Sequence, residues 1–165
     1  MKNLFVFIFV FIGNLITHAQ ELDKIPAVQI NDVNGNVINT AEYSNGGSPM
    51  IINFWATWCS PCKRELNAIH RIYPTWKEET GVKLIAVSVD DERTSNRVKQ
   101  YVEASQWEFE VWLDPTGIFK NAMNVNNVPH TVLIDGNGKI VYVHSNYVAG
   151  DEDKLYEEIL KLVRK

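Results

Sequence analysis

The feature that most constrains this chain is the stretch from Ile51 to Glu65, which contains both cysteines of the sequence. Residues 50–55 form a short apolar run rich in β-branched and aromatic side chains, which predicts a strand buried on both faces. The residues after this run change to a helical spacing. We therefore expect Cys59 and Cys62 at the point where a strand ends and a helix begins.

The start of a helix favours thiol chemistry. Its first backbone N–H groups have no helical partner and carry the positive end of the helix dipole, so a thiolate there is stabilised and the pKa of the thiol falls. Cysteines three residues apart on a first helical turn lie close enough to form and break a disulfide. Cys59, nearer the helix end, is predicted to be the attacking thiol, and Cys62 to resolve a mixed disulfide.

Metal sites also use a Cys-x-x-Cys spacing. A closed zinc site needs four ligands, and the sequence has neither a second such pair nor a His pair at a suitable spacing, so no zinc site is predicted. A Cu(I)-binding chaperone that uses Cys59, Cys62 and His130 remains the alternative function, because soft thiolates suit Cu(I). A structural disulfide is disfavoured, since closing so short a loop removes little entropy from the unfolded chain.

The flanks of the cysteine pair resemble the thioredoxin superfamily, and specifically its extracytoplasmic TlpA/ResA-like branch. The matching residues are 54–65, Phe-Trp-Ala-Thr-Trp-Cys-Ser-Pro-Cys-Lys-Arg-Glu, and Val128-Pro129 with the strand 130–135 behind them. The likeness covers almost all of the chain after residue 25. It implies an α/β, thioredoxin-like three-layer fold with a central mixed β-sheet, an N-terminal β-hairpin and an inserted α/β element.

The resemblance also implies a set of site residues. Thioredoxin-like proteins place a cis-proline opposite the cysteines, and Pro129 occupies that position, so substrate is expected against the backbone near Val128 and Pro129. Asn53 stands where thioredoxins carry a buried Asp, and Glu65 matches the glutamate that ResA-like proteins use instead. Helix spacing places Glu65 one turn from Cys62, where it could exchange a proton with that thiol. An ordinary first-turn glutamate is the alternative.

For four further residues near the motif, a functional role has to be weighed against a structural one. Trp58 is predicted either to contact substrate or to pack, and Trp55 to pack in the core. His130 is expected to be a polar residue at the start of a strand rather than a ligand. Asp90 ends a parallel strand, where ligands often bind, although an acidic turn explains it equally well.

Residues 1–19 have the layout of a secretory signal peptide, with an early Lys, an apolar run and small residues at Thr17 and Ala19. Cleavage after Ala19 would leave residues 20–165 as a single thioredoxin-like domain. The apolar run is shorter than the ~20 residues that span a bilayer, although an anchor formed by residues 4–16 remains the alternative. The expected location is the periplasm or another extracytoplasmic compartment.

Charge and resemblance together limit the partners. The net charge is −4 and no basic cluster is longer than Lys63-Arg64, which excludes the electrostatic footprint of a nucleic-acid-binding protein. The resemblance implies a protein-disulfide oxidoreductase that reduces exported proteins, with apocytochrome c among the implied targets. A membrane thiol-transferring reductase would re-reduce it. No cofactor is required, and we expect a monomer.

The remaining pattern predicts the order of the elements. The helix that starts near Ser60 is expected to kink or break at Pro74 and to end at Gly81. The other expected elements are a hairpin over 27–38, a strand over 82–89 parallel to the first, a helix over 94–105, a short strand over 111–113, a hairpin over 131–144, and a helix over 151–165 with Leu155, Ile159, Leu160 and Val163 inward.

Overall fold

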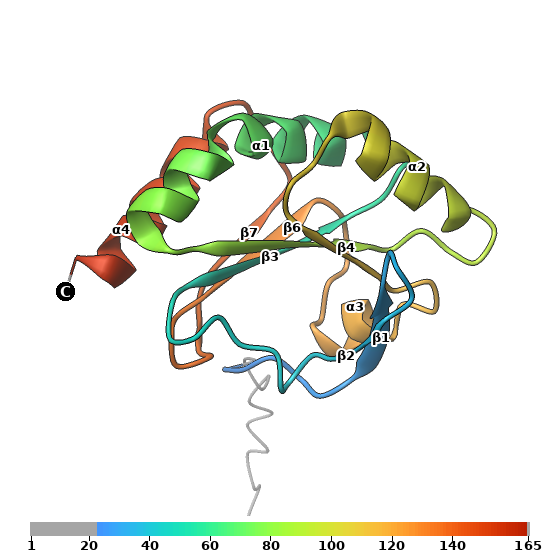
Figure 1. Ribbon diagram of the computed structural model, residues 1–165, viewed down its shortest axis with the longest axis horizontal. Helices are drawn as coiled ribbons and strands as arrows, with labels where there is room; N and C mark the ends of the chain where they lie inside the picture. Colours follow the sequence, from blue (N-terminus) through green and yellow to red (C-terminus); the bar gives the residue numbers. More distant parts are fainter. Residues whose placement is uncertain (1–22, 165) are drawn as a thin grey trace, which may run out of the picture.

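The computed structural model describes residues 23–164, which form a seven-stranded mixed sheet with helices on both faces (Figure 1). The strand order is β2-β1-β5-β4-β3-β6-β7. The predicted leader, residues 1–19, lies outside the described residues. Among residues 23–164 no helix has the length and apolar character to cross a membrane.

The strands are β1 (Gln29–Asp32), β2 (Val37–Asn39), β3 (Met50–Trp55), β4 (Lys83–Ser88), β5 (Glu110–Leu113), β6 (His130–Ile134) and β7 (Ile140–Ser145), and the helices are α1 (Ser60–Thr80), α2 (Asn96–Ser105), α3 (Ile118–Ala122) and α4 (Asp151–Val163).

Strand β3 is an interior strand of the sheet, and all six of its residues are buried. It pairs in parallel with β4 and antiparallel with β6, so it has a hydrogen-bonded neighbour on each side. This confirms the strand predicted from the apolar run. The chain leaves β3 at Trp55 and enters α1 at Ser60, which puts both cysteines at the end of the most enclosed strand.

Apolar side chains on the two faces of the sheet form two cores. Helices α1, α2 and α4 cover one face, where Leu66, Val98 and Ile159 are wholly buried (Figure 1). Helix α3 lies on the other face, where Phe119 packs together with Ile30 of strand β1. The expected three-layer α/β fold is confirmed.

Helix α1 corrects part of one expectation, because it is not interrupted at Pro74, and it ends at Thr80 with the expected Gly81 as its C-cap. A proline inside a helix costs about 3 kcal/mol, since it removes one backbone hydrogen bond and its ring clashes with the preceding turn. Packing on both sides of Pro74 offsets that cost. Tyr73 is buried and its hydroxyl accepts a hydrogen bond from the backbone N of Leu84, while Trp76 stacks on Tyr156 with ring centroids 5.2 Å apart.

The expected N-terminal hairpin and inserted α/β element are both present and depend on each other. Strand β5 pairs in parallel with β4 and antiparallel with β1, so the insertion joins the hairpin to the rest of the sheet. Between α2 and β5, Trp107 packs edge-on against Trp55 with centroids 4.8 Å apart. The insertion therefore covers the strand that leads to the cysteines.

Helix α4 differs from the expected pattern at its C-terminal end. Leu155 and Ile159 are buried, as predicted, but Val163 is 37% exposed. Leu162 packs against the core in its place. Positions 155, 159 and 162 lie on one face at the helical spacing, whereas 163 has rotated past that face in the last turn.

Candidate active site

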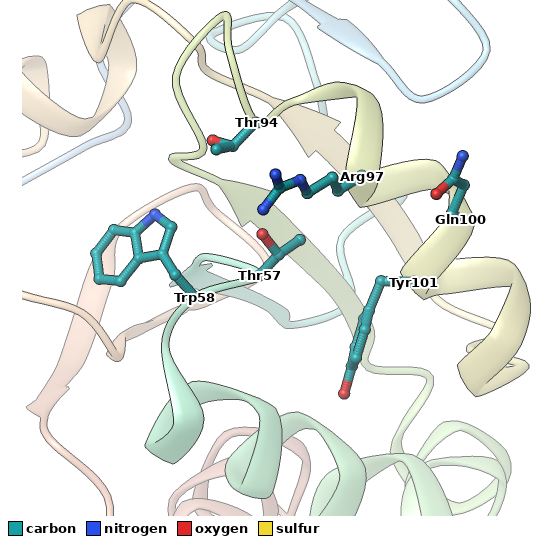
Figure 2. Close-up of a pocket in the computed structure, with 6 residues that line it drawn as sticks. All are labelled: Thr57, Trp58, Thr94, Arg97, Gln100 and Tyr101. Carbon is teal, nitrogen blue, oxygen red and sulfur yellow. The ribbon is translucent and has the colours of Figure 1, made fainter.

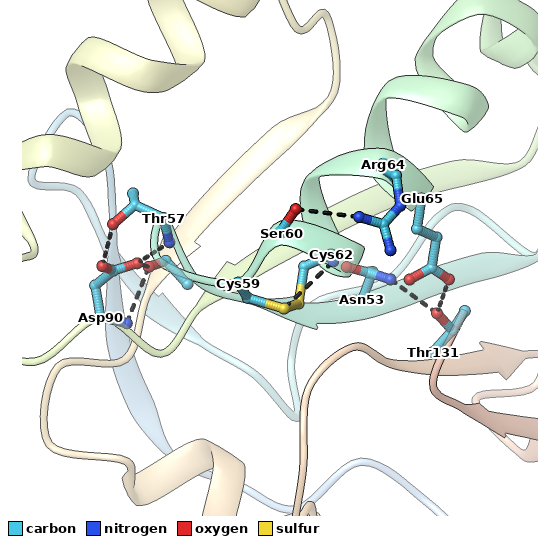
Figure 3. Close-up of a disulfide and its surroundings, with 10 residues drawn as sticks. Asn53, Thr57, Cys59, Ser60, Cys62, Arg64, Glu65, Asp90 and Thr131 are labelled. Carbon is cyan, nitrogen blue, oxygen red and sulfur yellow. Dashed lines mark hydrogen bonds between the residues drawn. A yellow bond between two sulfur atoms is a disulfide. The ribbon is translucent and has the colours of Figure 1, made fainter. Parts of the chain in front are cut away.

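Cys59 and Cys62 are joined by a disulfide at the start of α1 (Figure 3). Cys59 is the N-cap residue, and its Sγ accepts a hydrogen bond from the backbone N of Cys62 at 3.3 Å. The N-cap of a helix usually offers a side-chain oxygen to these backbone groups. Here a sulfur takes that position, so a thiolate at Cys59 would face the unpaired N–H groups and the positive end of the helix dipole.

The two sulfurs differ in access. Cys59 is 5% exposed and Cys62 is 0% exposed, because Cys62 lies one turn into α1 on the face that packs against the sheet. A disulfide on another protein can approach Cys59, whereas Cys62 is reached through Cys59. This difference in burial agrees with the order of attack predicted from the sequence.

Asp90, which is 1% exposed, anchors the loop between β3 and α1. Its carboxylate accepts hydrogen bonds from the backbone N of Thr57 at 2.7 Å, from the hydroxyl of Thr57, and from the hydroxyl of Ser88 at 2.8 Å. The sequence suggested a ligand site or an acidic turn for Asp90, but these contacts give it a third role, as an internal anchor of the loop. It fixes the backbone just before Trp58 and Cys59 (Figure 3).

The two tryptophans of the motif have different environments. Trp55 is wholly buried beneath α2, between Tyr101 and Trp107, as expected of a core residue. Trp58 is 64% exposed beside the disulfide and lines two surface hollows. One hollow, of about 470 Å³, lies against α2, and we call it the Arg97 hollow. The other, of about 460 Å³, includes Val128 among its lining residues, and we call it the Val128 hollow.

Val128 and Pro129 lie at the same end of the sheet as the disulfide. The peptide bond between them is cis, as the resemblance implies. In the antiparallel pairing of β3 with β6, Phe54 is opposite His130, so Pro129 lies beside the end of β3 from which the cysteine loop starts. Val128 and Trp58 line one hollow, which brings together the two residues predicted to contact substrate.

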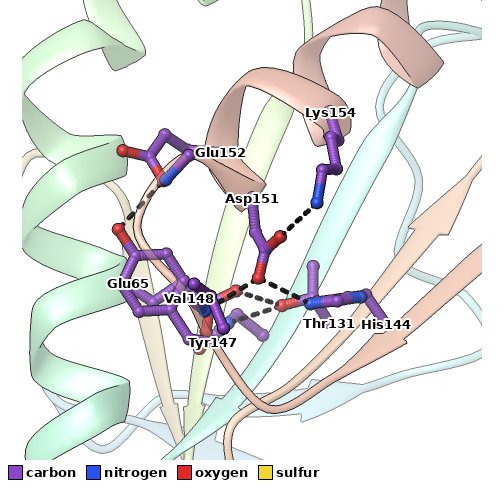
Figure 4. Close-up of polar contacts among 10 residues, drawn as sticks. Glu65, Thr131, His144, Tyr147, Val148, Asp151, Glu152 and Lys154 are labelled. Atoms are coloured by element: carbon purple, nitrogen blue, oxygen red, sulfur yellow. Dashed lines mark hydrogen bonds and ion pairs between the residues drawn. The ribbon is translucent and has the colours of Figure 1, made fainter.

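Glu65 is buried behind the disulfide, with only 4% of its surface exposed. Its Oε1 accepts a hydrogen bond from the hydroxyl of Thr131 at 2.7 Å, and that hydroxyl accepts one from the side-chain amide of Asn53 at 2.8 Å (Figures 3 and 4). Among the described residues, Oε2 of Glu65 has no hydrogen-bond partner. Glu65 is therefore not an ordinary solvated first-turn glutamate.

The hydrogen-bond directions fix which oxygen of Glu65 can hold a proton. A hydroxyl has one proton to donate, and because Asn53 donates to Thr131, the proton of Thr131 goes to Oε1. Oε1 is then occupied as an acceptor, and a proton added to the carboxyl belongs on Oε2. Burial raises the pKa of Glu65, and the hydrogen bond from Thr131 opposes that rise because it stabilises the ionised form.

Thr131 is opposite His144 in the pairing of β6 with β7. His144 and the charged side chains next to it pair with one another and not with Thr131. The carboxylate of Asp151 binds Nζ of Lys154 at 2.9 Å and Nε2 of His144 at 3.1 Å (Figure 4). Hydrogen bonding to Lys154 and to the backbone N of Val148 lowers the pKa of Asp151 to about 2. Thr131 is left as the hydrogen-bond donor to Glu65.

The structure does not gather the three ligands of the copper alternative. His130 stands at the start of β6, and its Nδ1 is 2.8 Å from the hydroxyl of Ser145. Burial and the nearby His144 lower its pKa. In residues 23–164 no three His, Cys, Asp or Glu side chains lie close enough together to hold a metal ion.

Sequence reasoning did not assign roles to Asp90 and Thr131. A signal was present for Thr131, because it is a polar residue inside an apolar strand, as is Asn53. Two such residues on neighbouring strands indicate a buried polar pair. Asp90 had a weaker signal, since a carboxylate that follows a strand fits a turn, a ligand site or an anchor.

Comparison with known proteins agrees with the site. The family described as "AhpC/TSA family" matches residues 22–143. A curated relative, the thiol-disulfide oxidoreductase ResA of Bacillus thuringiensis subsp. konkukian, is 32% identical over 141 residues, which cover 85% of this chain and 76% of that protein.

Solved structures agree with the fold. An uncharacterized thioredoxin-like protein from Porphyromonas gingivalis is 46% identical, with a TM-score of 0.77 over 85% of this chain and 92% of that one. A putative thiol:disulfide interchange protein DsbE from Chlorobium tepidum is 27% identical, with a TM-score of 0.75 over 86% of this chain and 96% of that one. These likenesses confirm the thioredoxin-like fold and the relation to ResA- and DsbE-type proteins.

Because the carboxyl of Glu65 is buried, we predict that it lowers the stability of the folded protein in a pH-dependent way. An unfolded Glu65 ionises near its ordinary pKa of 4.5, but the folded protein resists ionisation because its pKa is raised. Stability is therefore lost as pH rises from that value through the folded pKa, by about 1.4 kcal/mol for each pH unit between the two pKa values. Glu65→Gln should remove this loss.

The measurement is urea unfolding of the oxidised protein at about pH 4 and pH 8. The free energy of unfolding of Glu65→Gln should rise relative to wild type between the two pH values. Glu78→Gln, on the exposed side of the same helix, is the matched control and should follow wild type. Parallel curves for Glu65→Gln and wild type would mean that the carboxyl titrates normally.

Proposed function

The chain belongs to the AhpC/TSA family and is a thiol-disulfide oxidoreductase of the ResA/DsbE type, and we propose that it reduces disulfides of exported proteins. One observation carries the proposal. Cys59, which is 5% exposed and forms the N-cap of a helix, is paired with Cys62, which is wholly buried. That arrangement suits exchange with a large partner better than permanent cross-linking, because only one sulfur meets the partner.

Exchange proceeds in two steps. The Cys59 thiolate attacks one sulfur of the substrate disulfide, which forms a mixed disulfide and releases the other substrate sulfur as a thiolate that takes a proton from solvent. Cys62 then loses its proton and attacks Sγ of Cys59. The substrate leaves as a dithiol, and the Cys59–Cys62 disulfide re-forms. The two electrons that Cys59 and Cys62 lose are the two that the substrate disulfide gains.

Glu65 is the group that we propose accepts the proton of Cys62. Helix spacing puts it one turn from Cys62, its pKa is raised by burial, and its Oε2 is free of hydrogen bonds within the described residues. Thr131 is a positioning residue here, because it occupies Oε1 and leaves Oε2 for the proton.

Trp58, Val128 and Pro129 are proposed to hold the substrate segment. Trp58 offers a large exposed apolar surface next to Cys59, and it lines the Val128 hollow together with Val128. Aromatic side chains with one wet edge are common at protein interfaces because they bury large areas with few rotatable bonds. The mixed disulfide would lie between Trp58 and the Val128-Pro129 backbone.

The compartment and the partners follow from the expected leader and from the relatives. A signal peptide over residues 1–19 would export the domain, as a monomer, to the periplasm or another extracytoplasmic space. A reductase there needs electrons from inside the cell, so a membrane thiol-transferring reductase is the proposed donor. Apocytochrome c is the target implied by the resemblance to the ResA-like branch. No cofactor takes part in the exchange.

The order of attack predicts which variant accumulates an intermediate. Cys62→Ser leaves Cys59 able to attack and nothing to resolve the product, so a mixed disulfide with an oxidised peptide should persist and be visible by mass spectrometry under non-reducing conditions. Cys59→Ser should abolish turnover, with no adduct. An adduct that forms only with Cys59→Ser would reverse the two roles.

The direction of electron flow is tested by the reduction potential of the Cys59–Cys62 couple, measured by equilibration with glutathione or dithiothreitol. A reductase should have a value near or below about −250 mV. A value nearer about −120 mV would make the protein an oxidant that introduces disulfides, with the same exchange chemistry run in the opposite direction.

Thr131 predicts a shift in the pH dependence of exchange. Thr131→Val removes a hydrogen bond that stabilises the ionised carboxyl, so the pKa of Glu65 should rise further above its ordinary value. The rate of resolution by Cys62 should then reach half its maximum at a correspondingly higher pH. Stopped-flow measurement of substrate release across pH gives this midpoint.

Two further variants separate proton transfer from packing. Thr131→Ser keeps the hydroxyl and should keep the wild-type midpoint. Glu65→Gln should lose this pH-dependent step altogether. If all three variants follow the wild-type profile, Glu65 does not handle the proton.

A further inference from the structure

The face that presents Cys59 carries a second feature that disulfide exchange itself does not require. The Arg97 hollow lies between the cysteine loop and α2 (Figure 2), and Trp58 lines both this hollow and the Val128 hollow. Its lining residues are Thr57, Trp58, Thr94, Arg97, Gln100 and Tyr101. In Figure 2 the guanidinium of Arg97 extends toward Thr57 and Trp58, whereas Gln100 points away.

Arg97 is the one charged group that lines this hollow, and its side chain is uncommitted. The hydroxyl of Thr57 binds Asp90 and that of Thr94 binds Asp91, so both are already in use. The guanidinium of Arg97 makes no ion pair and no hydrogen bond to any of residues 23–164. It therefore keeps its five donors available in a fork that matches a carboxylate.

The nearby acidic residues do not neutralise Arg97. Asp90 is buried and bound to Thr57 and Ser88, and Asp91 pairs with Arg93 at 2.7 Å. Glu92, the remaining acid of that loop, is exposed and lines neither hollow. The positive charge on this side of Trp58 is thus uncompensated.

Cations also lie elsewhere around the disulfide. Lys120 lines the Val128 hollow, and Nζ of Lys63, in the first turn of α1, lies 5.5 Å from the ring centre of Tyr101. Neither makes an ion pair within residues 23–164. This face is positive on a chain whose net charge is −4, so it has a local charge that favours acidic partners over basic ones.

We infer that the Arg97 hollow binds a carboxylate side chain, an Asp or Glu two residues from the reacting cysteine in an extended segment of the protein substrate. The inference rests on the proposed function and adds a sequence preference to it. A segment whose cysteine meets Cys59 must pass Trp58, which lines both hollows. In an extended chain successive side chains point to opposite sides, so the residue two positions from the cysteine faces the protein on the same side as the cysteine. That residue would then reach the guanidinium of Arg97.

The size of the preference follows from the exposure of Arg97. An exposed ion pair contributes only a little, which corresponds to about a two- to fivefold difference in rate constant, and salt screens it. Arg97 is thus a specificity-determining residue rather than a catalytic one. It would act on the encounter with substrate and leave the exchange between sulfurs to the cysteines.

The test uses three disulfide peptides that differ only at the position two residues from one cysteine, where they carry Glu, Gln or Lys. Fully reduced protein is mixed with each peptide, and the second-order rate constant is measured by stopped-flow at low salt and at about 0.5 M salt. Wild type should reduce the Glu peptide about two- to fivefold faster than the Gln peptide and the Lys peptide slowest, and salt should shrink the differences.

Substitutions of Arg97 locate the effect. Arg97→Gln should bring the Glu/Gln ratio close to one, and Arg97→Glu should make the Lys peptide the fastest. Lys99→Gln, on the same helix and outside the hollow, changes the net charge by the same amount and should retain the wild-type ratio. A gain for the Lys peptide in Arg97→Glu cannot come from misfolding.

The outcomes separate the two proposals. A wild-type protein that reduces all three peptides at one rate overturns the inference and leaves the proposed reductase function intact. A Glu/Gln ratio that survives in Arg97→Gln, or that is lost equally in Lys99→Gln, also overturns it, because the effect would then belong to overall charge. If wild type reduces none of the peptides, the reductase function and the inference both fail.

Discussion

The unpaired backbone N–H groups at the start of α1 are the constraint on which the site depends. Their position is set by β3, which is buried along its whole length and delivers the chain to the helix from the interior of the sheet. Asp90 fixes the intervening loop from below through Thr57, so Cys59 meets those groups with little freedom to move away. The reactivity of the sulfur thus derives from the architecture of the sheet.

The carboxyl of Glu65 is buried behind the cysteines, although its burial is unfavourable and packing alone would not offset it. The Asn53–Thr131–Glu65 chain of hydrogen bonds satisfies one carboxyl oxygen and leaves the other bare. Asn53 gives this chain its direction, since an aspartate there would be an acceptor and would compete with Glu65 for the single proton of Thr131. The amide at position 53 and the glutamate at position 65 therefore belong to one arrangement.

The sequence predicted the parts of this structure that depend on local pattern. The strand over 50–55, the helix start at Ser60 and the cis-proline position followed from period, spacing and motif resemblance. It did not predict contacts between distant segments. Thr131 is 66 residues from Glu65, and the packing of Trp76 on Tyr156, which helps α1 continue through Pro74, joins helices far apart in the chain. Propensity alone carries no information about either contact.

The difference in access between Cys59 and Cys62 also limits the order of events in a catalytic cycle. With Cys62 enclosed, the donor of electrons and the acceptor must both react at the same sulfur, and two proteins cannot occupy it together. The cycle is then of the ping-pong type, in which each partner leaves before the other arrives. Donor and substrate become mutual competitors, and flux depends on the ratio of their concentrations as much as on their separate affinities.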